Sequence, residues 1–191
     1  MNRNHLRCLL ATSATALLVG AVAAPAAAAP TNAKVGGGAL SVSGVSVPDF
    51  PGATLDGQPK AVTAAMANFS VSDARGNGFG WNVTVQATQF AEWDAATATL
   101  VSGGKTLALN SLKLPTPAVT ADGTTSPPPS VVAGPHRIDT TGAVKIASAA
   151  TDTGMGKYNF SVADPLELTI PANAYAKTYR STVTLSVVSG P

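Results

Sequence analysis

The sequence has almost no cysteine or histidine, and it is sparse in charge. One Cys and two His occur in 191 residues, and only 12% of the residues are Asp, Glu, Lys or Arg. Cys8 and His5 lie within the first ten residues, and His136 is the one histidine beyond them. Disulfides, a thiolate nucleophile and a zinc site built from His and Cys are therefore excluded for the rest of the chain.

The remaining polar residues give little support for catalysis. His136 stands beside a proline-rich stretch with no nucleophile motif near it, and we interpret it as an exposed loop residue. Glu92 and Asp94 flank Trp93, whereas the carboxylates of a glycosidase usually come from different strands. We therefore predict no enzymatic activity, no cofactor and no metal. A glycan hydrolase using Glu92 or Asp94 is the enzymatic alternative.

The first 29 residues have the pattern of a secretory signal peptide. Two arginines precede an apolar run from Cys8 to Ala24, and small residues suited to cleavage follow. The run of about 17 residues is short for a membrane span. We expect residues 1–29 to be removed and residues 30–191 to form a single domain without a membrane span.

The mature chain carries almost no net charge. Removing Arg3 and Arg7 from the twelve basic residues leaves ten, against ten acidic residues. This balance does not favour nucleic acid or an anionic membrane as a partner. We therefore expect ligand contacts to be polar and aromatic rather than electrostatic.

The hydrophobic pattern predicts an all-β fold. Val, Thr, Ser, Ala and Gly are abundant, and period-2 alternation recurs between turn signals. We predict an antiparallel β-sandwich of about eight or nine short strands, with a long proline-rich loop. The loop is expected over residues 115–135, with a short strand at Val131 and Val132 as an alternative. A second loop is expected over residues 92–100, with a helical turn as an alternative. Predicted strands include residues 81–87, 105–114, 157–162, 166–170 and 179–188.

The most specific stretch, residues 69–90, has the pattern of a strand, a turn and a second strand. Trp81 opens an eight-residue alternation of apolar and polar side chains, so we expect it to be the largest side chain of the core. Glycines before it supply the positive φ angles that a hairpin loop needs. The turn that feeds Trp81 is expected to be exposed, with Asp73 and Arg75 as its charges.

This stretch resembles the first conserved block of the WxL-domain proteins, which are secreted surface proteins of Gram-positive bacteria. The block maps onto Asp73, Arg75, Gly76, Gly80, Trp81, Val83 and Phe90. The closing strands are also similar to the family pattern, but the second motif stands as Leu185-Ser186-Val187 and lacks its Trp. The resemblance implies non-covalent attachment to the cell wall, with peptidoglycan as the ligand.

Aromatic faces pack on sugar rings, which makes Trp81, Trp93 and Tyr175 candidate ligand contacts together with Asp73 and Arg75. Trp93 and Tyr175 lie in weakly patterned segments and are the candidates for exposed aromatics. The first hypothesis is a secreted, non-catalytic protein that binds peptidoglycan or another cell-wall glycan. The alternative is a structural or adhesive subunit that binds other surface proteins through exposed strand edges.

Overall fold

The computed structural model describes residues 31–190. The chain divides into two units, Met1–Lys34 and Val35–Pro191. The predicted signal peptide, residues 1–29, lies outside the described residues. Residues 31–34 have no regular secondary structure, and every strand belongs to the second unit. In the described part of the chain, no helix is long and apolar enough to cross a membrane.

All regular structure in residues 31–190 is β-strand, and every strand pairing there is antiparallel. The predicted all-β, antiparallel class is confirmed. This part of the chain forms fifteen strands in four sheets, more than the predicted eight or nine. Four of the strands have only two residues, which is too few to show an alternation of side chains in the sequence.

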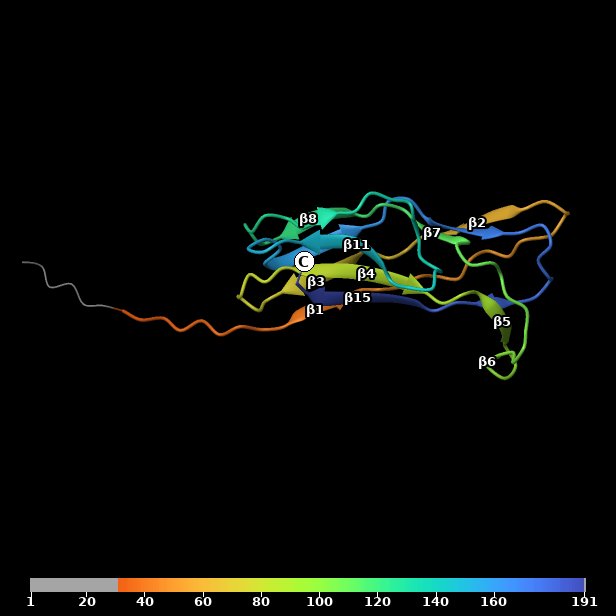
Figure 1. Cartoon of the computed structure of the whole chain (residues 1–191), viewed down its shortest axis with the longest axis horizontal. Coiled ribbons are helices and arrows are strands. Elements are labelled where there is room, and N and C mark those ends of the chain that lie inside the picture. The colour runs from red at the N-terminus through yellow and green to blue at the C-terminus, as the bar shows by residue number, and fades with distance from the viewer. Residues whose placement is uncertain (1–30, 191) are drawn as a thin grey trace, which may run out of the picture. The chain divides into compact units, whose positions relative to one another are not determined.

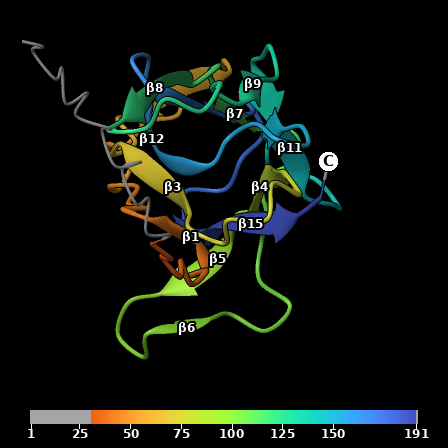
Figure 2. The same cartoon turned by 90° about the vertical axis from the view of Figure 1, so that its left-hand side faces the viewer.

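Two four-stranded sheets face each other across the core, as Figure 2 shows. The first has the order β1 (Leu40–Ser43), β3 (Phe69–Asp73), β12 (Gly156–Ser161), β8 (Ala118–Asp122). The second has the order β15 (Val183–Ser189), β4 (Trp81–Ala87), β11 (Val144–Ala149), β9 (Ser130–Val131). Side chains alternate between core and surface along β3 and β4, as half-buried sheets require.

The core between these sheets is aromatic at its centre. The Trp81 ring of β4 lies 6.4 Å from the Tyr158 ring and 6.5 Å from the Phe160 ring, both of β12. Phe69 stacks on Phe160 at 4.8 Å within the first sheet. Contacts between aromatic side chains therefore join the two sheets, which fits the predicted sandwich.

Two further sheets extend the sandwich. One has the order β10 (His136–Arg137), β7 (Leu112–Leu114), β13 (Leu166–Ile170), β2 (Lys60–Ala64). The other has three short strands in the order β14 (Tyr179–Arg180), β5 (Ala91–Asp94), β6 (Thr99–Leu100). Figure 1 shows β5 and β6 at the end of this unit opposite to the start of β4.

Two loop assignments are wrong. Residues 92–100 form a hairpin of β5 and β6, and all four side chains of β5 are partly exposed, so no alternation marks the strand. The loop predicted over residues 115–135 contains β8, which was not expected, and β9, which overlaps the short strand considered at Val131 and Val132. β8 is the outermost strand of its sheet and is mostly exposed, which hides its period in the sequence.

Two strand assignments are wrong in extent. In residues 105–114 only β7 is a strand, because Asn110 adopts a positive φ of 63° that interrupts the extended chain. Residues 179–188 are divided between two sheets, because β14 pairs with β5 whereas β15 pairs with β4. At the break, the Thr182 carbonyl accepts a hydrogen bond of 3.0 Å from the Thr88 backbone N–H.

His136 is buried, and its assignment to an exposed loop is wrong. It lies in β10, opposite Leu114 of β7, with 7% of its surface exposed. Its ring Nε2 lies 3.1 Å from the carbonyl oxygen of Val132, an arrangement in which the N–H donates. This contact therefore ties β10 to the chain segment that precedes it.

Candidate functional site

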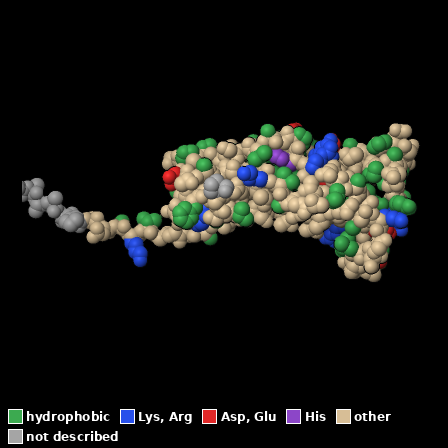
Figure 3. All heavy atoms as spheres, in the orientation of Figure 1, with side chains coloured by type: hydrophobic (Ala, Val, Ile, Leu, Met, Phe, Trp, Pro, Cys, Tyr) green, Lys and Arg blue, Asp and Glu red, His purple; other side chains and the backbone are tan. Residues whose placement is uncertain are grey.

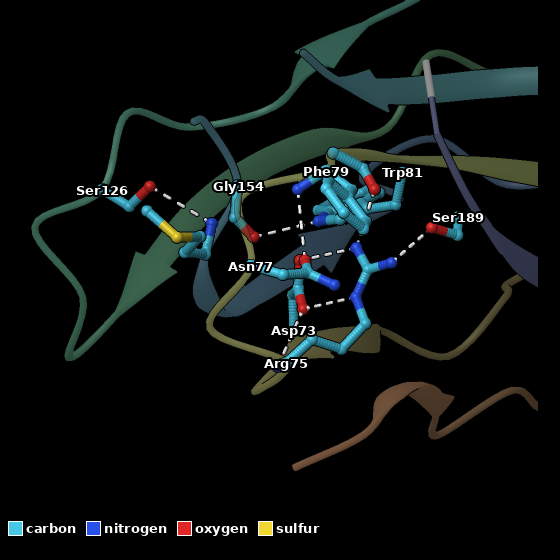
Figure 4. Close-up of polar contacts among 10 residues, drawn as sticks. Asp73, Arg75, Asn77, Phe79, Trp81, Ser126, Gly154 and Ser189 are labelled. Atoms are coloured by element: carbon cyan, nitrogen blue, oxygen red, sulfur yellow. Dashed lines mark hydrogen bonds and ion pairs between the residues drawn. The ribbon is translucent and has the colours of Figure 1, made fainter. Parts of the chain in front are cut away.

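An ion pair between the buried Asp73 and the partly exposed Arg75 holds the turn before Trp81, as the dashed lines in Figure 4 show. Only 3% of Asp73 is exposed, and Arg75 donates from Nε and Nη2 to its two carboxylate oxygens at 2.9 Å each. The guanidinium also donates to the Gly80 carbonyl at 2.7 Å and to the Ser189 hydroxyl at 2.5 Å. The expected exposure is wrong for Asp73, which is buried, whereas Arg75 is partly exposed and Gly76, Asn77 and Phe79 of the turn are exposed as expected. Arg75 fastens the turn to the end of β15 through Ser189.

The ion pair shifts the pKa values of both partners. Hydrogen bonding from the Arg75 guanidinium lowers the pKa of the Asp73 carboxyl below its ordinary value of 3.8. In return, hydrogen bonding to Asp73 raises the pKa of Arg75. Both groups stay charged at neutral pH, so the two parallel hydrogen bonds are charge-assisted and directional.

Trp81 lies wholly inside the sandwich, as its alternation predicts. None of its surface is exposed, and its indole Nε1 donates to the Gly154 carbonyl at 2.9 Å. Gly80, just before it, has a φ of 71°, and a Cβ there would collide with the carbonyl oxygen of Ala149. The Gly-Trp pair therefore has a packing role, because a ring without exposed surface cannot stack on a ligand.

The two family-like motif segments are neighbours in one sheet. In the pairing of β4 with β15, Val83 lies opposite Val187, and Val85 lies opposite Leu185. Leu185, which stands where the second motif would have its Trp, is 8% exposed and belongs to the core. Having Leu instead of Trp at this position therefore changes the packing of the core. Phe90, which closes the first motif, is also buried, at 7%.

Exposed aromatic and basic side chains meet at the opposite end of this unit, around β5, β6 and β14. The Arg180 guanidinium lies 4.2 Å from the centroid of the partly exposed Trp93 ring. Lys105 Nζ lies 4.4 Å from the centroid of the Tyr175 ring, and 56% of Tyr175 is exposed. Figure 3 shows basic side chains bordering hydrophobic ones over this end. We call the surface formed by Trp93, Tyr175, Lys105 and Arg180 the aromatic end.

Two shallow hollows lie at the aromatic end. One is lined by Thr88, Trp93, Leu100, Arg180, Ser181 and Thr182. The lining of the other includes Lys105, Thr106, Pro171, Asn173 and Tyr175. Each hollow combines an aromatic ring, a cation and hydrogen-bonding groups, which are the contacts that sugar rings and their substituents use.

The two carboxylates beside Trp93 are held in their ionised forms. Hydrogen bonds from the Lys105 backbone N–H at 3.0 Å and from Lys177 Nζ lower the pKa of Glu92. Bonds from the Thr97 hydroxyl and the Ala96 N–H, both 2.9 Å, lower the pKa of Asp94. A general acid needs a raised pKa, so these environments oppose the hydrolase alternative.

Sequence reasoning found Trp93 and Tyr175 but missed the cations above their rings. Arg180 follows Tyr179 on the polar side of a predicted strand, and Lys105 follows two glycines. Nothing in either local pattern points to an aromatic partner elsewhere in the chain. The β14–β5 pairing brings Arg180 beside Ala91 and hence next to Trp93.

The described residues thus form an antiparallel all-β fold with a buried Trp motif at one end and exposed aromatic–cation pairs at the other. A family model described as WxL domain surface cell wall-binding matches residues 23–191. The chain therefore belongs to the WxL family, whose domains bind the cell wall, and it functions at the cell wall or cell surface. No curated protein and no solved structure is detectably similar to the chain.

Proposed function

We propose that this protein is secreted and attaches non-covalently, without catalysis, to peptidoglycan or another glycan of the Gram-positive cell wall. The aromatic end makes the contact. The observation that carries this proposal is the accessibility of the aromatic rings: Tyr175 and Trp93 reach the surface beside hollows, whereas Trp81 does not. Asp73 and Arg75 pair with each other in the turn, so they contribute to binding only by stabilising the fold.

Replacing Trp93 and Tyr175 with Ala should each weaken binding to purified sacculi by roughly two- to tenfold. This range corresponds to the roughly 0.5 to 1.5 kcal/mol of a specific aromatic contact. The matched control is Phe79→Ala, which removes a 61% exposed aromatic from the turn before Trp81, at the opposite end of the unit. A pull-down titration checks the prediction, and a loss for Phe79→Ala equal to that for Trp93→Ala would contradict it.

An exposed edge strand favours a second candidate function, the binding of another surface protein by strand addition. β8 lies at the edge of its sheet and pairs only with β12, and four of its five residues are exposed. It carries no proline, lysine or bulge, and its one charge, Asp122 at the end of the strand, is paired with Lys157 of β12.

If β8 receives a partner strand, its amides should exchange hydrogen about tenfold or more slowly when other surface proteins of the cell are added, because a new ladder protects them. The measurement is hydrogen exchange resolved to Ala118–Asp122. Thr120→Lys, which puts a charge on the exposed edge, should abolish the slowing. Equal exchange with and without added proteins would exclude this edge as the docking site.

A further inference from the structure

The positive charge of Arg180 is uncompensated. Five ion pairs lie within residues 31–190, and none of them includes Arg180 or Lys105. The two nearby carboxylates already have donors of their own, since Glu92 is paired with Lys177 and Asp94 accepts from its own turn. Neither carboxylate therefore forms an ion pair with Arg180.

The Arg180 guanidinium contacts the Trp93 ring but has no hydrogen-bond partner among the described residues. It lies over the Trp93 ring at 4.2 Å, and among the described residues no hydrogen bond leaves its side chain. A guanidinium stacked on a ring keeps its donors in the plane of the fork, the geometry that binds carboxylate or phosphate in a bidentate manner. The contact with Trp93 restrains the guanidinium, and its N–H donors have no partner within residues 31–190.

The rest of this hollow is uncharged. Leu100 is 57% exposed and offers an apolar wall, while Thr182 contributes a hydroxyl group. Ser181 and Thr88 are tied to each other, with the Ser181 hydroxyl donating to the Thr88 carbonyl at 2.5 Å. A sugar ring could pack on the apolar wall while its anionic substituent reaches the guanidinium.

We propose that the hollow lined by Trp93, Leu100 and Arg180 binds an anionic group, a carboxylate or a phosphodiester, carried on a sugar-based wall polymer. This inference rests on the proposed function and names its ligand chemistry. It revises the expectation, drawn from the near-zero net charge, that ligand contacts are not electrostatic. Charges farther than about 10 Å from a ligand are largely screened, so nearby charges matter more than the net charge. The local charge of the hollow decides the contact.

Arg180→Gln should weaken binding to purified sacculi at low salt by about tenfold or more, because it removes the charge and the fork. Arg180→Lys should bind with intermediate strength, since it keeps the charge and loses the bidentate geometry. Arg137→Gln is the matched control, because Arg137 is an exposed arginine on β10 of another sheet. Wild-type binding should fall as NaCl is raised.

Two chemical treatments of the sacculi identify the source of the anion. Hydrofluoric acid removes polymers joined through phosphodiesters, and carbodiimide with an amine converts carboxylates into amides. Loss of wild-type binding after the first treatment assigns a phosphodiester, and loss after the second assigns a carboxylate. Full binding after both treatments overturns the inference.

Leu100→Glu provides a second test that leaves Arg180 in place. A carboxylate introduced at this exposed position lies in the same hollow and competes for the guanidinium, so it should weaken binding as Arg180→Gln does. If the wild-type protein binds sacculi and both variants bind equally well, the inference fails while the proposed function stands. If the wild-type protein binds no sacculi at all, the proposed function itself fails.

Discussion

Replacing Trp81 with Ala should lower the free energy of unfolding by roughly 3 to 5 kcal/mol, the usual cost of removing a large buried aromatic side chain. The ring is fully buried between the two main sheets and contacts Tyr158 and Phe160. Truncation also leaves the Gly154 carbonyl without its indole donor. Chemical denaturation at neutral pH measures the change.

Phe79→Ala again serves as the comparison, because Phe79 is two residues away and largely exposed. It should change the free energy of unfolding by no more than about 0.5 kcal/mol, as surface substitutions usually do. An unchanged melting temperature for Trp81→Ala together with lost wall binding would mean that Trp81 contacts the ligand directly. That result would contradict its assignment to the core.

Replacing Arg75 with Ala should lower the free energy of unfolding at pH 7 by about 3 kcal/mol, because it leaves the buried Asp73 carboxylate without its cation. We expect the lower end of the range for buried pairs, since 13% of the Arg75 side chain is exposed. Ser189→Ala, which removes one acceptor of Arg75 and keeps the ion pair, should cost only about 1 kcal/mol.

The effect of Arg75→Ala should depend on pH. Arg75 lowers the pKa of Asp73 below 3.8, so the ion pair contributes stability that is fully present above that value. This contribution is lost as the pH falls through the lowered pKa, because the carboxylate becomes protonated. The difference between the wild-type protein and Arg75→Ala should be largest at pH 7 and shrink on acidification. A difference that grows towards low pH would contradict the assignment.

Alternation predicts a strand well where one face is buried and the other is wet. It found β4, whose inward residues are buried, and β13, where Leu166 and Leu168 are buried and Ile170 is partly so. It failed for β5, where all four side chains are partly exposed, and for β8 at the sheet edge. Strands of this kind are fixed by backbone pairing with a neighbour, and a local sequence pattern does not record such pairing.

The sequence by itself determined the all-β class, the buried position of Trp81 and the relation to the WxL family. These features depend on local order: alternation places Trp81 inward, and the glycines before it permit the turn. The charges of that turn were placed on the surface, whereas the structure buries Asp73 with Arg75 against the end of β15. That contact joins segments far apart in the chain.

Only the tertiary structure decided where a ligand can be held. The pairing of β14 with β5 brings Arg180 over Trp93, and the packing around β5 brings Lys105 over Tyr175. A sequence records each residue type and its immediate neighbours, but a binding surface depends on side chains that meet across strands. For this protein the sequence therefore specified the scaffold, and strand pairing assembled the aromatic end.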